Sequence, residues 1–228
     1  MHLNRLNAPK TWKLKEIKSK KWITKSIPGP HSVKTSLPIN ILLKEVLNYA
    51  NTTRETKNIV TNKKVLVNKK VVKTINYPVG MFDVIEFPEI NECYRLILDK
   101  DRRFNVKKIK KEESNLRPCK VIGKKLQKKG KIQLGFDNGM SLITDDKTIK
   151  VGDTVVIELE KIKIVKHLKF SEGVLVMITE GKHIGNTGTI KEIKSGVMGR
   201  KSVKVNVDGV LIETSGDYAF VLDDELSY

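Results

Sequence analysis

The fold of this chain is decided by residues 37–87, whose sequence is LPINILLKEVLNYANTTRETKNIVTNKKVLVNKKVVKTINYPVGMFDVIEF. Its first part repeats apolar residues at the three- and four-residue spacing of one helix face, which predicts an amphipathic helix. Proline suits a first helical turn, so we place Pro38 there and expect Ser36 to cap the helix. The apolar face comprises Ile39, Leu42, Leu43, Val46, Leu47 and Ala50.

A second, shorter helix is predicted after this one, because Thr52 and Glu55 have the spacing of a capping box. The pattern then changes to β-branched residues, and residues 65–72 predict two short strands around a polar turn. Residues 77–80 break the chain, and residues 81–87 predict a third strand. The cations at or beyond the exposed face of the second helix are Arg54, Lys57, Lys63 and Lys64.

This helix–helix–hairpin order, with residues 64–72 and 77–85, resembles the RNA-binding module named after bacterial ribosomal protein S four. That module also occurs in pseudouridine synthases and tyrosyl-tRNA synthetases. The resemblance implies that the cationic side of the unit, with Lys69 and Lys70 in the hairpin, binds RNA. The alternative is an ordinary α+β hairpin whose charges are merely solvated.

The charge of the chain favours a polyanionic partner. Its 228 residues include 44 Lys and Arg against 26 Asp and Glu, a formal net charge of +18, and phosphates neutralised by such cations release counterions. The alternatives are an anionic membrane surface or simple solubility. Residues 100–131 hold fourteen Lys and Arg against three acids, whereas residues 209–228 hold five acids and no Lys or Arg. We therefore expect the C-terminal tail to face away from a polyanion or toward a basic neighbour.

Membrane, secretory and metal signals are missing from the sequence. No apolar run reaches the length of a transmembrane helix, and residues 1–12 lack the apolar region of a secretory signal. Two cysteines, Cys93 and Cys119, cannot form a disulfide framework or a four-thiolate metal site. We expect both to be small buried residues in a reducing compartment.

Residues 1–36 lack a sustained apolar period and predict a flexible, basic, extended arm. Its lysines and arginine suit phosphates, and Trp12, Trp22 and His31 can either stack on bases or pack onto the protein's own core. Residues 2–12, HLNRLNAPKTW, followed by Gly-Pro-His at 29–31, resemble the N-terminal signature of small-subunit ribosomal protein four of the archaeal and eukaryotic type. The resemblance implies that an S-four-like module, a central β domain and a C-terminal KOW motif follow.

Residues 93–170 predict an all-β domain, a small barrel or sandwich, because short alternating strands are separated by frequent turn signals. The cationic cluster between residues 102 and 111 has the density of a phosphate-binding face. Its alternative is a solvated charge run. Residues 171–228 contain a strand, a loop with Gly181, Gly185 and Gly188, and another strand, which resembles a KOW motif on an SH3-like barrel. We expect these glycines to adopt angles or close approaches that a Cβ would forbid.

We find no catalytic constellation in the sequence. The four histidines are scattered, and H-E-x-x-H, C-x-x-C and G-x-S-x-G are all missing. We expect no enzymatic activity, no small-molecule substrate and no cofactor, apart from structural Mg²⁺ bound through rRNA.

The fold class is therefore predicted as α+β and multidomain: a basic arm (1–36), an S-four-like module (37–92), a central β domain (93–170) and a KOW-type SH3-like barrel with an acidic tail (171–228). The resemblance implies a structural constituent of the small ribosomal subunit. Its partners would be small-subunit rRNA and neighbouring ribosomal proteins, and its place the cytoplasm, with a nucleolar stage if eukaryotic. The competing hypothesis is a free RNA-binding regulator, such as a transcription elongation or RNA-modification accessory factor. The residues expected to bind RNA are Arg5, Lys10, Trp12, Lys13, Lys21, His31, Arg54, Lys57, Lys63, Lys64, Lys69, Lys70, Arg102, Arg103, Lys107, Lys108, Lys110, Lys111, Lys124, Lys125, Lys182 and His183.

Overall fold

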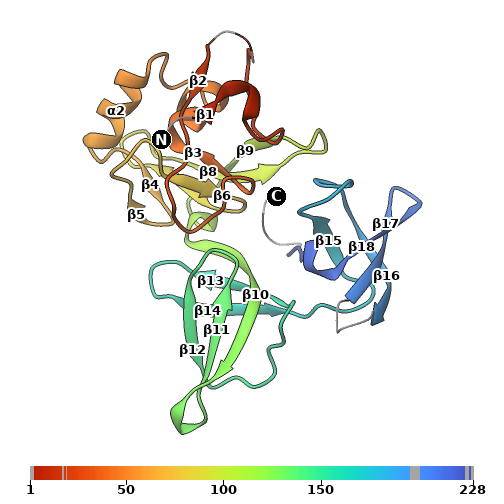
Figure 1. The fold of residues 1–228 in the computed structure, drawn as a ribbon. Helices are drawn as coiled ribbons and strands as arrows, with labels where there is room; N and C mark the ends of the chain where they lie inside the picture. The colour runs from red at the N-terminus through yellow and green to blue at the C-terminus, as the bar shows by residue number, and fades with distance from the viewer. Residues whose placement is uncertain (1–2, 17, 19, 196–200, 224–225, 227–228) are drawn as a thin grey trace. The chain divides into compact units, whose positions relative to one another are not determined.

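The structure, a computed structural model, describes residues 3–16, 18, 20–195, 201–223 and 226. The chain separates into two compact units, residues 1–117 and residues 118–226. Strands dominate both units, and helices are few and short (Figure 1). This agrees with an α+β chain that is rich in β-structure.

The N-terminal segment is folded, which corrects the prediction of a flexible arm. Strand β1 (Leu3–Asn4) pairs antiparallel with β2 (Trp22–Ile23), and a 3₁₀ turn over Arg5–Asn7 follows β1. The Trp12 side chain is 3% exposed, and its indole N–H donates to the Ser36 carbonyl at 2.8 Å. Burying an aromatic ring this completely fastens the segment to its unit.

The first predicted helix is shorter than expected. Strand β3 (Ser36–Pro38) pairs with β6 (Pro78–Gly80), so Ser36 is part of a strand and does not cap the helix. Helix α1 (Ile39–Ile41) begins after Pro38, which is its N-cap residue, and continues into a π-helical turn over Leu42–Val46. The helical segment ends before Asn48, whose φ of 59° is left-handed.

Helix α2 (Thr53–Thr61) starts as predicted. The Thr52 hydroxyl accepts from the Glu55 backbone N–H at 3.2 Å, and the Glu55 carboxylate accepts from the Thr52 N–H at 3.4 Å. This reciprocal capping box satisfies two backbone donors that the helix leaves free. Thr56 and Val60 are buried and Ile59 is half-buried, whereas Arg54, Lys57 and Asn58 are exposed on the outer face of α2.

The first unit is organised on a five-stranded sheet with the order β5-β4-β7-β8-β9 (Figure 1). The tight turn between β4 and β5 places Asn68 and Lys69 at φ of 49° and 63°, as type I′ hairpins require. Residues 92–109 pair directly with β7, whereas the sequence analysis places them in the central β domain. The strands are β4 (Leu66–Val67), β5 (Lys70–Val71), β7 (Val84–Phe87), β8 (Glu92–Leu98) and β9 (Phe104–Ile109).

The second unit contains two five-stranded sheets, and the first has the order β12-β11-β10-β13-β14. Its core is a cluster of buried residues that includes Cys119, Leu134 and Ile157. A 3₁₀ turn over Glu113–Asn115 precedes the sheet and another over Lys128–Gly130 joins β10 to β11. The strands are β10 (Leu116–Leu126), β11 (Ile132–Phe136), β12 (Ser141–Thr144), β13 (Thr154–Glu158) and β14 (Lys163–Leu168).

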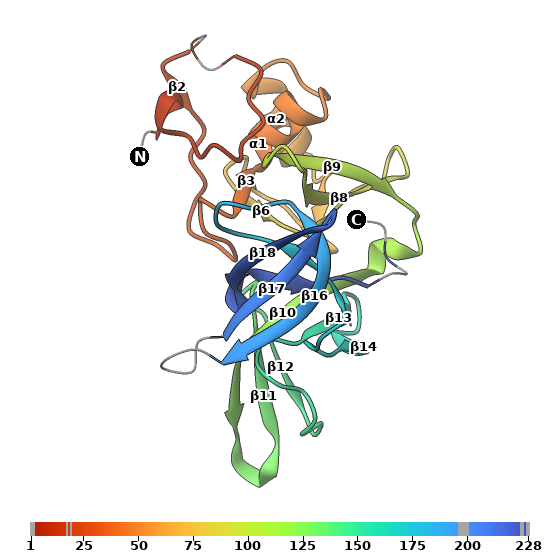
Figure 2. The ribbon, with the colours of Figure 1, turned by 90° about the vertical axis from the view of Figure 1, so that its right-hand side faces the viewer.

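The second sheet of this unit has the order β18-β17-β16-β15-β19 (Figure 2). Gly181 and Gly185 have φ of 93° and 87°, and a Cβ on Gly188 would lie 2.2 Å from the Asn206 carbonyl oxygen, which confirms the expected constraint on all three glycines. A 3₁₀ turn over Gly216–Tyr218 precedes the last strand. The strands are β15 (Leu175–Ile178), β16 (Thr187–Ser195), β17 (Lys201–Val207), β18 (Val210–Ser215) and β19 (Ala219–Val221).

Candidate nucleic-acid interface

Helix α2 presents a cationic outer face. Arg54 and Lys57 are exposed, and Lys63 is exposed just beyond the helix, with a left-handed φ of 58°. Lys64 is half-buried, and its Nζ lies 2.9 Å from the Glu89 carboxylate. Arg54, Lys57 and Lys63 are thus available to phosphates, whereas Lys64 already has a partner within the protein.

The β4–β5 hairpin carries the next two predicted residues in different environments. Lys69 Nζ lies 2.9 Å from Glu86 Oε1 and donates to the Ser114 hydroxyl at 3.3 Å. Lys70 is exposed on β5. The hairpin therefore offers Lys70 to solvent and uses Lys69 to hold the turn against the sheet.

A buried carboxylate, Asp83, anchors this hairpin. Asp83 Oδ1 lies 2.9 Å from the Arg117 guanidinium Nε and accepts from the Asn68 side-chain amide at 2.8 Å. Its other oxygen accepts from the Gly80 N–H at 2.8 Å. Burial by itself would raise the pKa of Asp83, but Arg117, His31 and Asn68 overcome it and lower the pKa to about 2. The carboxylate is therefore ionised and holds the positive-φ turn in place.

His31 belongs to the same buried cluster, which corrects its assignment as an RNA contact. Its Nε2 lies 3.1 Å from Asp83 Oδ2, and its side chain is only 6% exposed. A Cβ on Gly80 would lie 2.4 Å from the imidazole ring, so glycine is required there for the ring to fit. An imidazole enclosed in this way cannot stack on a base.

Burial likewise corrects the prediction that Arg5 and Trp12 contact RNA. Arg5 is 7% exposed, and its guanidinium lies 3.0 Å from Glu45 and donates to the Glu16 carbonyl at 2.6 Å. Trp12 packs in the core of the first unit, whereas Trp22 is 53% exposed and has the Lys21 ammonium 5.1 Å from its ring centroid. Of the two tryptophans, Trp22 is the one placed to stack.

The cationic segment around β9 is exposed almost throughout. Arg102, Arg103, Lys107, Lys108, Lys110 and Lys111 are all exposed. The Lys108 ammonium donates to the Glu92 carboxylate, which also accepts from the hydroxyls of Tyr49 and Tyr94. Together these donors, Lys108 first, lower the pKa of Glu92 to about 2. Lys108 is thus partly neutralised, while Arg102, Arg103, Lys110 and Lys111 present their charges to solvent.

The remaining residues predicted to contact RNA differ in their exposure and in whether they have hydrogen-bond partners within the protein. Lys10 and Lys13 are exposed, although Lys13 Nζ lies within 3.4 Å of the Asn105 side chain. In the second unit the Lys124 ammonium donates to the carbonyls of Lys147 and Ile149 at 2.9 and 2.7 Å. The others in that unit lie on the surface: Lys125 and Lys182 are exposed and His183 is half-buried.

Three structural residues at the β4–β5 hairpin were missed from the sequence: Asn68, Asp83 and Arg117. Arg117 is fully buried, although arginine is usually exposed. Its only signal was the charge count of residues 100–131, which does not distinguish a buried cation from an exposed one. The contact with Asp83 forms through the tertiary fold, so no local spacing could predict it.

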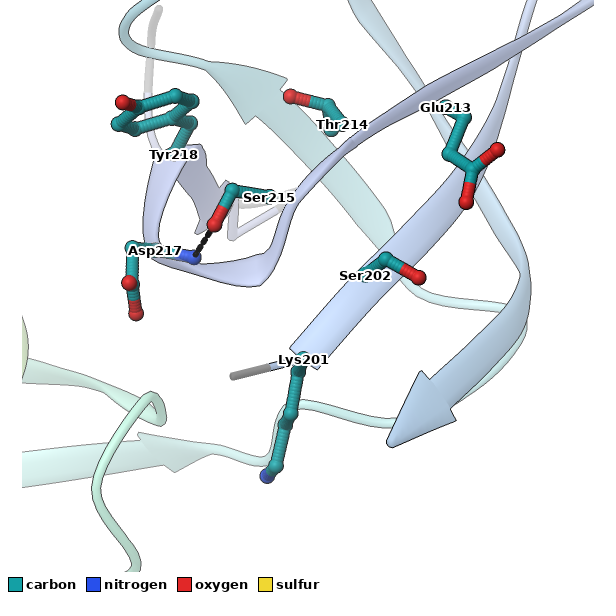
Figure 3. Close-up of a pocket in the computed structure, with 7 residues that line it drawn as sticks. All are labelled: Lys201, Ser202, Glu213, Thr214, Ser215, Asp217 and Tyr218. Atoms are coloured by element: carbon teal, nitrogen blue, oxygen red, sulfur yellow. Dashed lines mark hydrogen bonds between the residues drawn. The ribbon is translucent and has the colours of Figure 1, made fainter. Parts of the chain in front are cut away.

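A cavity of about 670 Å³ in the last sheet is lined by side chains of mixed charge (Figure 3). Lys201, Glu213 and Asp217 lie around it, with the Tyr218 ring and the hydroxyls of Ser202, Thr214 and Ser215. Ser215 accepts from the Asp217 N–H at 3.4 Å, which closes the turn beside the cavity. The lining lacks a histidine or cysteine that could act with a hydroxyl in nucleophilic catalysis.

Two other kinds of site are absent from the residues that the structure describes. No group of three or more His, Cys, Asp or Glu side chains is placed to hold a metal ion. No described helix combines the length and apolar character needed to cross a bilayer. Cys93 and Cys119 are buried free thiols, as expected.

Comparison with known proteins identifies the family. Over 224 residues the chain is 37% identical to small ribosomal subunit protein eS4 of Archaeoglobus fulgidus, covering 97% of this chain and 93% of that protein. The chain belongs to ribosomal family S4e. The family's own model matches residues 90–164, the RS4NT (NUC023) domain matches residues 1–34, and the S4 domain matches residues 38–85. The family assignment made from the sequence is confirmed.

A second relative and a solved structure support the same family assignment. The protein named small ribosomal subunit protein eS4 from Methanocella arvoryzae is 39% identical over 193 residues, which cover 85% of this chain and 81% of that protein. The crystal structure of 30S ribosomal protein S4e from Thermoplasma acidophilum superposes with a TM-score of 0.70 at 30% identity, covering 84% of this chain and 95% of that one. The S4e fold therefore extends over most of the chain, and residues 38–85 form its RNA-binding S4 domain.

Proposed function

We propose that this protein is a structural constituent of the small ribosomal subunit that binds rRNA and supports subunit assembly and translation. The observation that carries the proposal is an alignment over nearly the full chain, at 35–37% identity, with proteins named small ribosomal subunit protein eS4. The exposed cations of the S4 domain and of the β9 segment supply the chemistry, because lysine and arginine neutralise closely spaced phosphates.

Each part of the chain has a role in this proposal. The face formed by Arg54, Lys57, Lys63 and Lys70 docks on rRNA, and the buried charges around Asp83 hold the hairpin that carries Lys70. The last sheet acts as a KOW-type SH3-like barrel, with Lys182 and His183 at its loop toward RNA. The protein acts without catalysis or a cofactor of its own, and Mg²⁺ reaches it only through rRNA. It resides with ribosomes in the cytoplasm.

The second candidate function is that of a free RNA-binding regulator with a KOW domain. The matched relatives named as ribosomal proteins, aligned over nearly their whole length, disfavour it. Sucrose-gradient sedimentation of a lysate, at moderate and at high salt, separates the two functions. We expect the protein to migrate with small subunits and translating ribosomes at both salt concentrations. A protein that stays at the top of the gradient, or leaves the subunit at modest salt, would contradict the structural role.

A further inference from the structure

The β10–β11 hairpin of the second unit has an unusual charge. Residues 118–136 contain six lysines and no Asp or Glu, and five of these lysines lie at residues 124–131, around the turn. Lys125, Lys128 and Lys131 are exposed, and the structure shows no ion pair for them within its described residues. Like charges gathered on one turn repel each other, so this concentration costs stability unless a polyanion covers it.

The β10 side of the hairpin is exposed toward the turn. On β10 the buried positions end at Val121, yet pairing with β11 continues to Leu126, whose side chain is 74% exposed. The opposite strand is packed, because Ile132 and Leu134 of β11 belong to the core and β11 also pairs with β12. Figure 2 shows the turn that joins β10 and β11 at the free end of the hairpin. The exposed turn is therefore carried by strands that are anchored in the core through β11.

The turn of the hairpin has a defined conformation. The Gln127 N–H donates to the Lys131 carbonyl at 2.8 Å, and Gly130 closes the turn with a φ of 72°. Lys120, at the base of β10, donates to the carbonyls of Gly216, Asp217 and Ala219. Nearer the turn, Lys124 donates to the carbonyls of Lys147 and Ile149 and so braces the hairpin against the following segment. Lys124 is therefore a support, and the charges beyond it are held on a preformed hairpin.

The amino-acid composition of the hairpin indicates which part of an RNA it can contact. Residues 118–135 contain no aromatic residue, histidine or arginine, so they offer neither a stacking surface nor a planar fork for base edges. Lysine ammonium groups act as point charges and suit phosphate oxygens. Asp145 and Asp146 follow β12, the neighbour of β11, and no described ion pair joins either of them to the hairpin lysines.

We propose that the β10–β11 hairpin is a further rRNA-docking element, separate from the S4 domain and the β9 segment, which contacts the phosphate backbone of an RNA helix through Lys125, Lys128 and Lys131. This inference rests on the proposed ribosomal function and adds to it a site, a chemical target and a mode of contact. Contact by phosphates alone fixes position on RNA and carries no sequence recognition.

The first test compares two triple variants with the same change in net charge. K125Q/K128Q/K131Q removes the hairpin charges, and K161Q/K163Q/K169Q removes three exposed charges at and beside β14. Binding of each full-length protein to a transcript of the small-subunit rRNA is measured by filter retention over a series of KCl concentrations. We expect the hairpin variant to bind about tenfold more weakly or worse, and the slope of log affinity against log salt to fall by about 2 to 3.

The second test locates the contact. Cys93 and Cys119 are buried, so an iron–EDTA probe can be attached selectively at Lys128→Cys, with Lys161→Cys as the matched control. Radicals from residue 128 should cleave a confined set of rRNA positions that the control does not cleave.

The outcomes separate this inference from the proposed function. If the wild-type protein fails to bind the rRNA transcript, the ribosomal function itself is contradicted. If wild type binds but the two triple variants weaken binding equally, or residue 128 cleaves no more than residue 161, the hairpin contact alone is overturned.

Discussion

At the scale of single residues, the buried Asp83 carboxylate has the largest structural consequence. It is 1% exposed and faces Arg117, which is fully buried, so each charge depends on the other for its solvation. Removing one partner of such a pair leaves an uncompensated buried charge. The same carboxylate orients the Asn68 amide, whose oxygen accepts from the Val84 N–H at 3.0 Å, and thus ties the cationic hairpin to β7.

Asp83→Asn should therefore lower the free energy of unfolding of the first unit by about 3 to 5 kcal/mol. Trp12 and Trp22, the only tryptophans, both lie in this unit, so tryptophan fluorescence in a urea titration reports its unfolding alone. Asp101→Asn, at an exposed turn, is the matched control and should change stability by less than about 0.5 kcal/mol. Equal effects of the two variants would show that the buried pair is not needed.

The pH dependence follows from the same group. The pKa of Asp83 falls from 3.8 to about 2 on folding, so its contribution to stability is complete above about pH 4 and is lost as the pH drops toward 2. The difference in unfolding free energy between wild type and Asp83→Asn should shrink over that interval. Taking the difference cancels other groups, including Glu92, that titrate in the same range. A difference that stays constant from pH 5 to pH 2.5 would contradict the assignment.

At the scale of elements, close strand contacts decide which residues the last sheet tolerates. Gly188 lies on β16 beside β17, where the Asn206 carbonyl oxygen occupies the space of a Cβ. Gly123, on β10, has nothing within 4 Å of its Cβ position. Of these two strand glycines, Gly188 is the one that a close backbone contact requires to be glycine.

Gly188→Ala should force β16 and β17 apart, at a cost of about 1 to 3 kcal/mol. Hydrogen exchange of the amides in β15–β17 should accelerate, whereas Gly123→Ala should leave exchange in the last sheet unchanged. Slow exchange retained in Gly188→Ala would mean that the strands adjust without loss.

At the scale of the whole molecule, the N-terminal segment is an integral part of the first unit. Trp12 contacts the Ser36 carbonyl, Arg5 pairs with Glu45, and His31 reaches Asp83. The family match for residues 1–34 therefore covers a segment that helps to bury the core of its neighbour.

A fragment of residues 1–117 should accordingly unfold in one cooperative transition, whereas residues 37–117 should be less stable by several kcal/mol, because Trp12 burial, the Arg5–Glu45 ion pair and the His31–Asp83 contact are lost. Circular dichroism during thermal melting of both fragments measures this. Equal melting temperatures of the two fragments would show instead that residues 1–36 are an arm that does not stabilise the unit.

Features that depend on neighbouring residues were predictable from the sequence. The capping box at Thr52, the β4–β5 turn and the positive φ of Gly181 and Gly185 are of this kind, since their hydrogen bonds and dihedral angles are local. The need for glycine at 188 was also expected, but its cause, the Asn206 carbonyl oxygen, lies on another strand. The family was also evident, because its motifs occur in order along nearly the whole chain.

Which charges and aromatic rings remain at the surface follows from the tertiary fold alone. Arg5, Trp12 and His31 belong to a basic segment that resembles an RNA-binding arm, but each is buried against residues distant in sequence. Strands β8 and β9 likewise join the sheet of the S4 domain through pairing with β7. Burial and ion pairing depend on which segments, distant in sequence, come into contact in the fold. Composition and periodicity do not contain that information.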